Sequence, residues 1–196
     1  MVVTNKDIKG NKYKKLMTYM TQYCDTIVFQ LHNMDKMFDD EIVSGNENVE
    51  DVEFEIYDDI ELFYKYKNDV ENLMKSTGIY ADIKNAYESL NYYGNGCNYV
   101  FDVYVLSISD NTLSFLGKST SLYKWCYPSL PEDICFYKNN RCILETITHE
   151  KYCFLYTDDA EALKELEKIG LKIDSTYPDK EYLILNDENK VVRIMR

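Results

Sequence analysis

The stretch ICFYKNNRCILETI, residues 134–147, predicts two antiparallel strands joined by a tight turn. Both halves are rich in β-branched and aromatic residues, which favour strands. Asn139 and Asn140 stand between the halves, and Asn tolerates the positive φ that a two-residue hairpin turn requires. The resulting register pairs Lys138 with Arg141, Tyr137 with Cys142, Phe136 with Ile143 and Cys135 with Leu144. Cys135 and Cys142 are then diagonal neighbours on one face, and we expect both thiols to be reduced and buried.

Further strands are predicted around this hairpin. Residues 26–32 and 151–157 are short and β-branched or aromatic, and 181–195 predicts a terminal hairpin. The stretch 98–109 is apolar on both faces, which indicates a central strand. In residues 49–57 the apolar Val52, Phe54 and Ile56 alternate with acidic residues. This alternation predicts a strand with one buried face, near a sheet edge.

Helices are predicted between the strands. Apolar residues recur at helical spacing in residues 12–24, and carboxylates at 58–59 suit the start of a helix that ends at Gly78. Further predicted helices cover 80–93, a short segment within 119–127, and a segment that Asp158 caps and Gly170 ends. The sum is a single α+β domain over residues 1–196, with a mostly antiparallel sheet and helices packed on one side.

The composition limits the classes of function. The net charge of −12 argues against direct binding to nucleic acid or to an anionic membrane, which both need Lys and Arg. It favours a basic protein partner, which a negative field would steer. We find no apolar run long enough to span a membrane and no signal sequence, and six cysteines fit a reducing cytosol, so we expect a cytoplasmic protein.

The sequence lacks the common motifs for cofactor binding, nucleophilic catalysis and zinc binding. The sequence has no phosphate-binding glycine loop and no nucleophile elbow, so we predict no cofactor. The segment HEKYC at 149–153 departs from the zinc-protease motif, and the cysteine spacings do not fit a zinc site, so we predict no metal. An enzyme that uses His149 with Glu150 or a nearby Cys is kept as an alternative function, and a structural or regulatory subunit is another.

Residues 39–61, DDEIVSGNENVEDVEFEIYDDIE, hold eleven carboxylates and no Lys or Arg. The order of acids does not match a calcium loop, which leaves a solvated surface or a protein-binding face. As a strand, the segment would place Glu53 and Glu55 about 6.7 Å apart on one face, and such a row could enter a basic groove that normally holds nucleic acid. The predicted binding residues are Asp39, Asp40, Glu41, Glu47, Glu50, Asp51, Glu53 and Glu55.

Residues 121–150 carry a resemblance. The segment SLYKWCYPSLPEDICFYKNNRCILETITHE contains the pattern W-x-Y-P-x-L-P-E-D-I-x-F, a turn, and a strand that ends in His-Glu. It resembles uncharacterised proteins of Gram-positive bacteria that look like immunity partners of secreted or contact-delivered toxins. The resemblance implies a small acidic protein that binds another protein, and it implies no catalytic residue.

We therefore expect a non-enzymatic inhibitor, an immunity protein that occludes the site of a basic toxin such as a nuclease. A phage-encoded inhibitor that mimics nucleic acid and blocks a bacterial defence nuclease would use the same physics, and the sequence does not separate the two.

Overall fold

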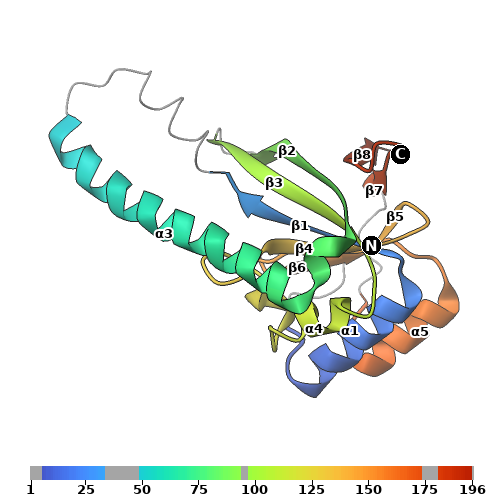
Figure 1. The fold of residues 1–196 in the computed structure, drawn as a ribbon. Helices are drawn as coiled ribbons and strands as arrows, with labels where there is room; N and C mark the ends of the chain where they lie inside the picture. The colour runs from blue at the N-terminus through green and yellow to red at the C-terminus, as the bar shows by residue number, and fades with distance from the viewer. Residues whose placement is uncertain (1–5, 34–48, 94–96, 174–180, 196) are drawn as a thin grey trace.

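The computed structural model describes residues 6–33, 49–93, 97–173 and 181–195 and shows an α+β fold (Figure 1). Within these residues, eight antiparallel strands form one sheet in the order β2-β3-β1-β4-β5-β7-β8, with β6 also paired to β5. The strands are β1 (Thr26–His32), β2 (Ile83–Tyr93), β3 (Cys97–Ser107), β4 (Glu132–Lys138), β5 (Arg141–Ile147), β6 (Tyr152–Leu155), β7 (Glu181–Leu185) and β8 (Val191–Met195).

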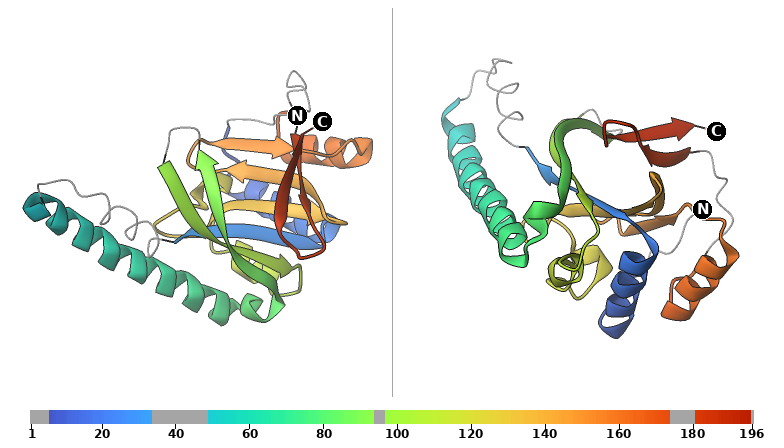
Figure 2. Two further views of the ribbon diagram at one scale, coloured as in Figure 1. Left: turned by 90° about the horizontal axis from the view of Figure 1, so that it is seen from above. Right: turned by 45° about the vertical axis from the view of Figure 1, so that its right-hand side comes forward.

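The helices gather on one face of the sheet, so the predicted fold class is confirmed. They are α1 (Asn11–Tyr23), α3 (Val49–Thr77), α4 (Thr112–Leu116) and α5 (Ala160–Ile169), with 3₁₀ turns η1 (Ile79–Asp82) and η2 (Leu122–Lys124). All four α-helices contribute to one buried cluster together with residues of β1 and β3–β6. The opposite face of the sheet carries no helix in the described part of the chain, and the sheet curls around it (Figure 2).

The central strands are apolar on both faces because each face has its own core. In β1, Ile27, Phe29 and Leu31 belong to the cluster under the helices. Val28, between them, belongs to a second cluster with Tyr137 and other residues on the concave face. Since successive strand residues point to opposite faces, this arrangement explains why the sequence of 26–32 shows no polar alternation.

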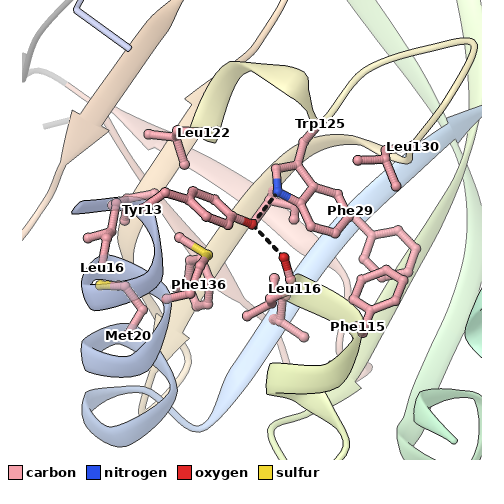
Figure 3. Packing of buried hydrophobic residues seen from close by; sticks show 14 of the residues in the cluster. Tyr13, Leu16, Met20, Phe29, Phe115, Leu116, Leu122, Trp125, Leu130 and Phe136 are labelled. Carbon is pink, nitrogen blue, oxygen red and sulfur yellow. Dashed lines mark hydrogen bonds between the residues drawn. The ribbon is translucent and has the colours of Figure 1, made fainter. Parts of the chain in front are cut away.

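The helix-side core is centred on Trp125, which is fully buried (Figure 3). Its indole Nε1 donates a hydrogen bond of 2.8 Å to the hydroxyl of Tyr13, which donates one of 2.7 Å to the carbonyl of Leu116. The ring centroid of Phe115 lies 5.2 Å from that of Trp125. These contacts join α1, α4 and the segment after η2 through side chains whose polar atoms are satisfied.

The prediction of a strand at 49–57 is wrong, because α3 begins at Val49 and continues to Thr77. The alternation of Val52, Phe54 and Ile56 is short, whereas apolar residues at intervals of three and four continue through Phe63 to the end of the helix. Glu and Asp in the first turns also suit the positive end of the helix dipole. The helical period of 3.6 residues, which continues over the 29 residues of α3, therefore decides the structure over the strand-like alternation of only five residues, 52–56.

The prediction of a helix at 80–93 is also wrong, because residues 83–93 form the edge strand β2. It pairs along its length with β3, from Ile83 opposite Leu106 to Tyr93 opposite Cys97. From residue 83 to residue 89 its side chains alternate between half-buried and exposed, which is the strand period. Asn, Ser and Tyr have modest helix propensity, and pairing with β3 decides the structure.

The hairpin at 134–147 is confirmed, with one change of register. Asn139 and Asn140 have φ values of 51° and 63° and are exposed, and Lys138 and Tyr137 pair with Arg141 and Cys142 as predicted. Phe136 pairs with Leu144 instead of Ile143, because β5 carries a bulge at this point. Cys135 and Cys142 are buried free thiols on the concave face, as predicted.

The remaining predictions are confirmed with smaller changes. Strands appear at 26–32, 97–107 and 152–155, the terminal hairpin is β7–β8, and helix α1 covers 11–23. β3 is interior, between β2 and β1. The segment 119–127 contains only the 3₁₀ turn η2, and α4 at 112–116 was not predicted. The cap of α5 is Asp159, one residue after the predicted Asp158.

Replacing Asp159 by alanine should lower the free energy of unfolding, because it removes the side-chain cap of α5. The Asp159 carboxylate accepts hydrogen bonds from the backbone N–H groups of Glu161 and Ala162 at 3.0 and 3.1 Å, and from the hydroxyl of Tyr23 at 2.9 Å. Urea unfolding followed by circular dichroism measures the change. Asp158→Ala is the matched control and should be nearly neutral, and equal effects of the two changes would contradict the capping role.

Candidate functional site

The structure separates the predicted acidic residues into two groups. Asp39, Asp40, Glu41 and Glu47 lie outside the described residues, while Glu50, Asp51, Glu53 and Glu55 lie in the first two turns of α3. Residues two apart on an α-helix are rotated by about 200° from each other, so 53 and 55 do not share a face. The predicted row of acids on one strand face is therefore wrong, and the acids are distributed around a helix.

Helix α3 extends well beyond the sheet at its N-terminal end (Figures 1 and 2). Its C-terminal part is anchored by Phe63, Tyr66, Val70 and Met74, which are each about 1% exposed. On either side of the first anchor in the sequence, two large apolar side chains stay exposed, Leu62 at 42% and Tyr64 at 47%, and the neighbouring Glu61 is exposed as well. The sequence 49–61 holds seven carboxylates and no Lys or Arg.

The concave face of the sheet lines a half-open cavity of about 490 Å³. The sheet curls until its two edge strands, β2 and β8, approach each other (Figure 2). The backbone N–H of Val191 in β8 donates a 2.7 Å hydrogen bond to the hydroxyl of Tyr87 in β2. Asn85 of β2 also reaches the carbonyl of Glu188 in the β7–β8 turn at 2.9 Å. The cavity is lined by residues of seven strands, among them Val28, Gln30, Ser89, Val103, Asp133, Cys135, Tyr137, Glu145, Leu183 and Arg193.

Glu145 is a buried carboxyl in the wall of this cavity. One of its oxygens accepts a 3.1 Å hydrogen bond from the guanidinium of Arg193, and the other accepts a hydrogen bond from the hydroxyl of Tyr156. Burial raises the pKa of Glu145, and the two hydrogen bonds and the charge of Arg193 oppose the rise without cancelling it. A charged residue in the apolar run ILETI of a central strand was the sequence signal for this group.

Asp133 is the second buried carboxyl in the wall. Its backbone has a φ of 54°, and its side chain accepts hydrogen bonds of 2.7 Å each from the backbone N–H of Thr148, the hydroxyl of Thr148 and the amide of Gln30. Burial raises the pKa of Asp133, and the bonds from Thr148 act in the opposite direction. This contact joins β4 to the turn that follows β5.

Tyr137 is fully buried in the cavity wall, and its hydroxyl has no hydrogen-bond partner among the described residues. Burial raises its pKa well above the ordinary value, so the group is a neutral phenol at physiological pH. A buried hydroxyl without a partner is uncommon, since more than 90% of buried polar groups are satisfied.

Glu132, Asp133 and His149 place one potential metal-ligand atom each within 4.8 Å of one another. The carboxylate of Glu132 already accepts hydrogen bonds from the backbone N–H of Tyr127 at 3.1 Å and contacts Nε2 of His32 at 3.2 Å. Burial would raise the pKa of Glu132, but the bond and charge of His32 lower it overall. A metal ion would have to replace these bonds and those of Asp133, so the donor set does not fit a resident metal.

The groups of the enzyme alternative are poorly suited to nucleophilic catalysis. His149 Nε2 lies 3.9 Å from Glu150 Oε1 and both side chains are 48% exposed, which is the geometry of a weak surface pair. Burial raises the pKa of Cys142 and of Cys153, and a protonated buried thiol is a poor nucleophile.

Comparisons of the chain with protein-family models, curated proteins and solved structures find no match. The resemblance of residues 121–150 to Gram-positive proteins therefore stays a prediction. In the described part of the chain, no helix combines the length and the apolar character that crossing a bilayer requires.

Proposed function

We propose that this protein is a non-enzymatic inhibitor that binds a basic protein through the projecting part of α3. The observation that carries the proposal is the placement of the acidic residues 49–61 on a helix that leaves the body of the protein (Figure 1). Helices that dock into a groove of a partner are a common mode of protein recognition. The most concrete form of the proposal is an immunity protein that covers the active site of a basic toxin, in a cytosol that keeps its cysteines reduced.

The charge density of α3 supports a partner that normally holds nucleic acid. Seven carboxylates over residues 49–61 correspond to about one charge per 3 Å of helix axis, given a rise of 1.5 Å per residue. Duplex DNA carries one charge per ~1.7 Å and a single strand one per ~3.4 Å. A basic groove built for phosphates would therefore meet a comparable field. This observation equally supports a phage-encoded inhibitor of a defence nuclease that acts by nucleic-acid mimicry.

The surface next to the acids could supply the contact energy that charges alone do not. Steering by exposed charges accelerates association, whereas affinity comes mainly from apolar and aromatic contacts at the centre of an interface. Leu62 and Tyr64 are exposed about 200° apart on the two flanks of the helix around Glu61, so a groove that surrounds this part of α3 would contact both. We therefore assign the rate of association to the carboxylates of α3, and the slow dissociation of the partner to Leu62 and Tyr64.

The experiment first examines the genes that flank this one: under the proposal, one of them encodes a basic protein whose toxicity is suppressed by co-expression. The variant E50Q/D51N/E53Q/E55Q should slow association roughly 10- to 100-fold at low salt, because steering contributes factors of this size. The difference should shrink towards molar salt, where the Debye length falls to about 3 Å. Stopped-flow or surface-binding kinetics over a salt series measure it.

The matched control neutralises the same number of exposed acids elsewhere. E161Q/E165Q/E167Q on α5 with D187N changes the net charge equally but leaves α3 intact. It should slow association far less than the α3 variant, and both variants should keep the circular dichroism spectrum of the wild type. Equal slowing by the two variants, or none by the α3 variant in low salt, would contradict the assignment of α3 as the binding face.

A further inference from the structure

The apolar face that anchors α3 to the body of the protein continues beyond the anchors. Phe63, Val70 and Met74 are buried in the helix-side core. Towards the N-terminus of the helix, valine or isoleucine recurs at intervals of three and four residues, at positions 49, 52, 56 and 60. With about 100° of rotation per residue, all of these positions fall within about 40° of one line along the helix. We call positions 49, 52, 56 and 60 the distal stripe.

The apolar face of α3 is covered by the body of the protein only along its C-terminal part. There the anchors pack in the core, and the hydroxyl of Tyr66 donates a 3.0 Å hydrogen bond to the carbonyl of Leu130. Beside the N-terminal turns of α3, both views show no other element of the described chain (Figures 1 and 2). Because burial of its apolar face is the main source of stability for an amphipathic helix, the distal stripe indicates a surface that another molecule covers.

The charges around the distal stripe determine which molecule fits it. Residues 49–61 hold seven carboxylates and no Lys or Arg. Positions 53 and 55 lie about 60° and 100° from the centre of the stripe, on its two sides, where paired helices form ion pairs with each other. A second copy of this chain would bring a second set of carboxylates to the same contact, and like charges in an interface are destabilising. The complementary surface is therefore apolar with Lys or Arg on both sides.

We propose that the distal stripe of α3 packs against a basic amphipathic helix of the protein partner, with Lys or Arg of that helix opposite Glu53 and Glu55. Two helices pair in this way when the side chains of one fit between those of the other. The inference rests on the proposed function, because it specifies the surface that α3 recognises on the basic partner. A groove that offers only phosphate-binding side chains would leave the distal stripe uncovered.

The test uses two synthetic peptides of equal composition and charge. KLLKKLLKKLLKKL places its leucines at the helical period, whereas KLKLKLKLKLKLKL places them at the strand period. Each peptide carries a fluorescein label and is titrated with the full-length protein at physiological salt, and fluorescence anisotropy measures binding. The helical peptide should bind roughly ten-fold more tightly, the difference expected from burial of one or two apolar side chains. Equal affinity for the two peptides would overturn the proposal.

Two double variants assign the difference to the distal stripe. V52A/I56A removes the centre of the stripe and introduces the best helix former, so the helical peptide should lose its roughly ten-fold advantage. The matched control F54A/Y57A changes positions that lie about 160° and 100° from the centre of the stripe, and it should keep the advantage. An unchanged preference in V52A/I56A, or an equal loss in the two variants, would contradict the assignment.

Two further measurements test other covers for the distal stripe. V52A/I56A should melt at the temperature of the wild type, and the wild type should sediment as a monomer. A lower melting temperature would show that this chain buries the stripe itself, and a wild-type dimer that V52A/I56A dissociates would show that a second copy does. Either result would overturn the proposal. The proposed function fails by a different result, an association rate with the natural partner that does not respond to the acid variant of α3.

Discussion

Replacing Trp125 by alanine is expected to lower the free energy of unfolding by about 3–5 kcal/mol, the largest effect of any single change proposed here. The side chain is fully buried at the centre of the helix-side core, and alanine would leave a cavity among Phe115 and its neighbours (Figure 3). The change also removes the indole N–H that donates to the hydroxyl of Tyr13. Since Trp125 is the only tryptophan, urea unfolding must be followed by circular dichroism.

Two tyrosine variants separate the polar part of this effect from packing. Tyr13→Phe removes the donor to the Leu116 carbonyl and the acceptor of the Trp125 N–H, and should cost about 1–3 kcal/mol, since both buried groups would be left unpaired. Tyr137→Phe makes the same chemical change at an equally buried site whose hydroxyl has no partner in the described part of the chain, and should cost nothing or stabilise the protein. Similar losses for the two variants would refute this view of the core.

The parts of the fold that the sequence predicted correctly are those with local signals. Asn139 and Asn140 adopt the positive φ that their side chains tolerate, and the flanking apolar runs become β4 and β5. The bulge that moves Phe136 from Ile143 to Leu144 has no comparable signal. It follows from the need to bury Ile143 and Leu144 in the same cluster, which is a tertiary requirement.

Two elements were predicted as the wrong type, a helix as a strand and a strand as a helix, and the physical reasons differ. In α3 a short alternation concealed a longer helical period, which becomes visible only when Val52, Ile56, Phe63, Val70 and Met74 are placed on one repeat. In β2 the local propensities were weak, and ten residues of pairing with β3 determined the outcome. This error changed the predicted site directly, because Glu53 and Glu55 had been assigned to one strand face and lie on a helix instead.

The cavity was not predictable from a linear pattern, because four of its polar groups come from three different strands. Asp133, Tyr137, Glu145 and Arg193 are separated by up to 60 positions and meet only when the sheet curls. The local signal was limited to single charges within apolar strands, in ILETI and VVRIM. Such charges indicate a partner inside the fold, but they do not identify which residue it is.

Asp133→Ala is expected to cost about 2–4 kcal/mol, the second-largest effect. The variant leaves the N–H and hydroxyl of Thr148 and the amide of Gln30 without their acceptor. It also places alanine at a φ of 54°, which Asp and Asn tolerate better. Asp133→Asn is the matched control, because it keeps the backbone tolerance and an oxygen for Thr148, and it should change the unfolding free energy by less than about 1 kcal/mol at neutral pH.

The pH dependence of these variants follows from the direction of the pKa shift. Burial raises the pKa of Asp133, with Glu132 adding to the rise and Thr148 and His149 opposing it. The folded state therefore holds this proton more tightly than the unfolded state does, and the contribution to stability is complete below the ordinary pKa near 3.8. It is lost as pH rises from that value through the raised folded pKa.

Asp133→Asn cannot titrate, so its stability relative to the wild type should increase as pH rises from about 4 towards neutrality. Measuring the difference in unfolding free energy between the two proteins at each pH cancels the titration of the other groups they share, including Glu145, whose pKa is shifted in the same direction. A difference that stayed constant over this interval would show that Asp133 titrates alike in the folded and unfolded chains. A difference that moved in the wild type's favour would mean that Thr148 and Gln30 stabilise the Asp133 carboxylate by more than its burial costs.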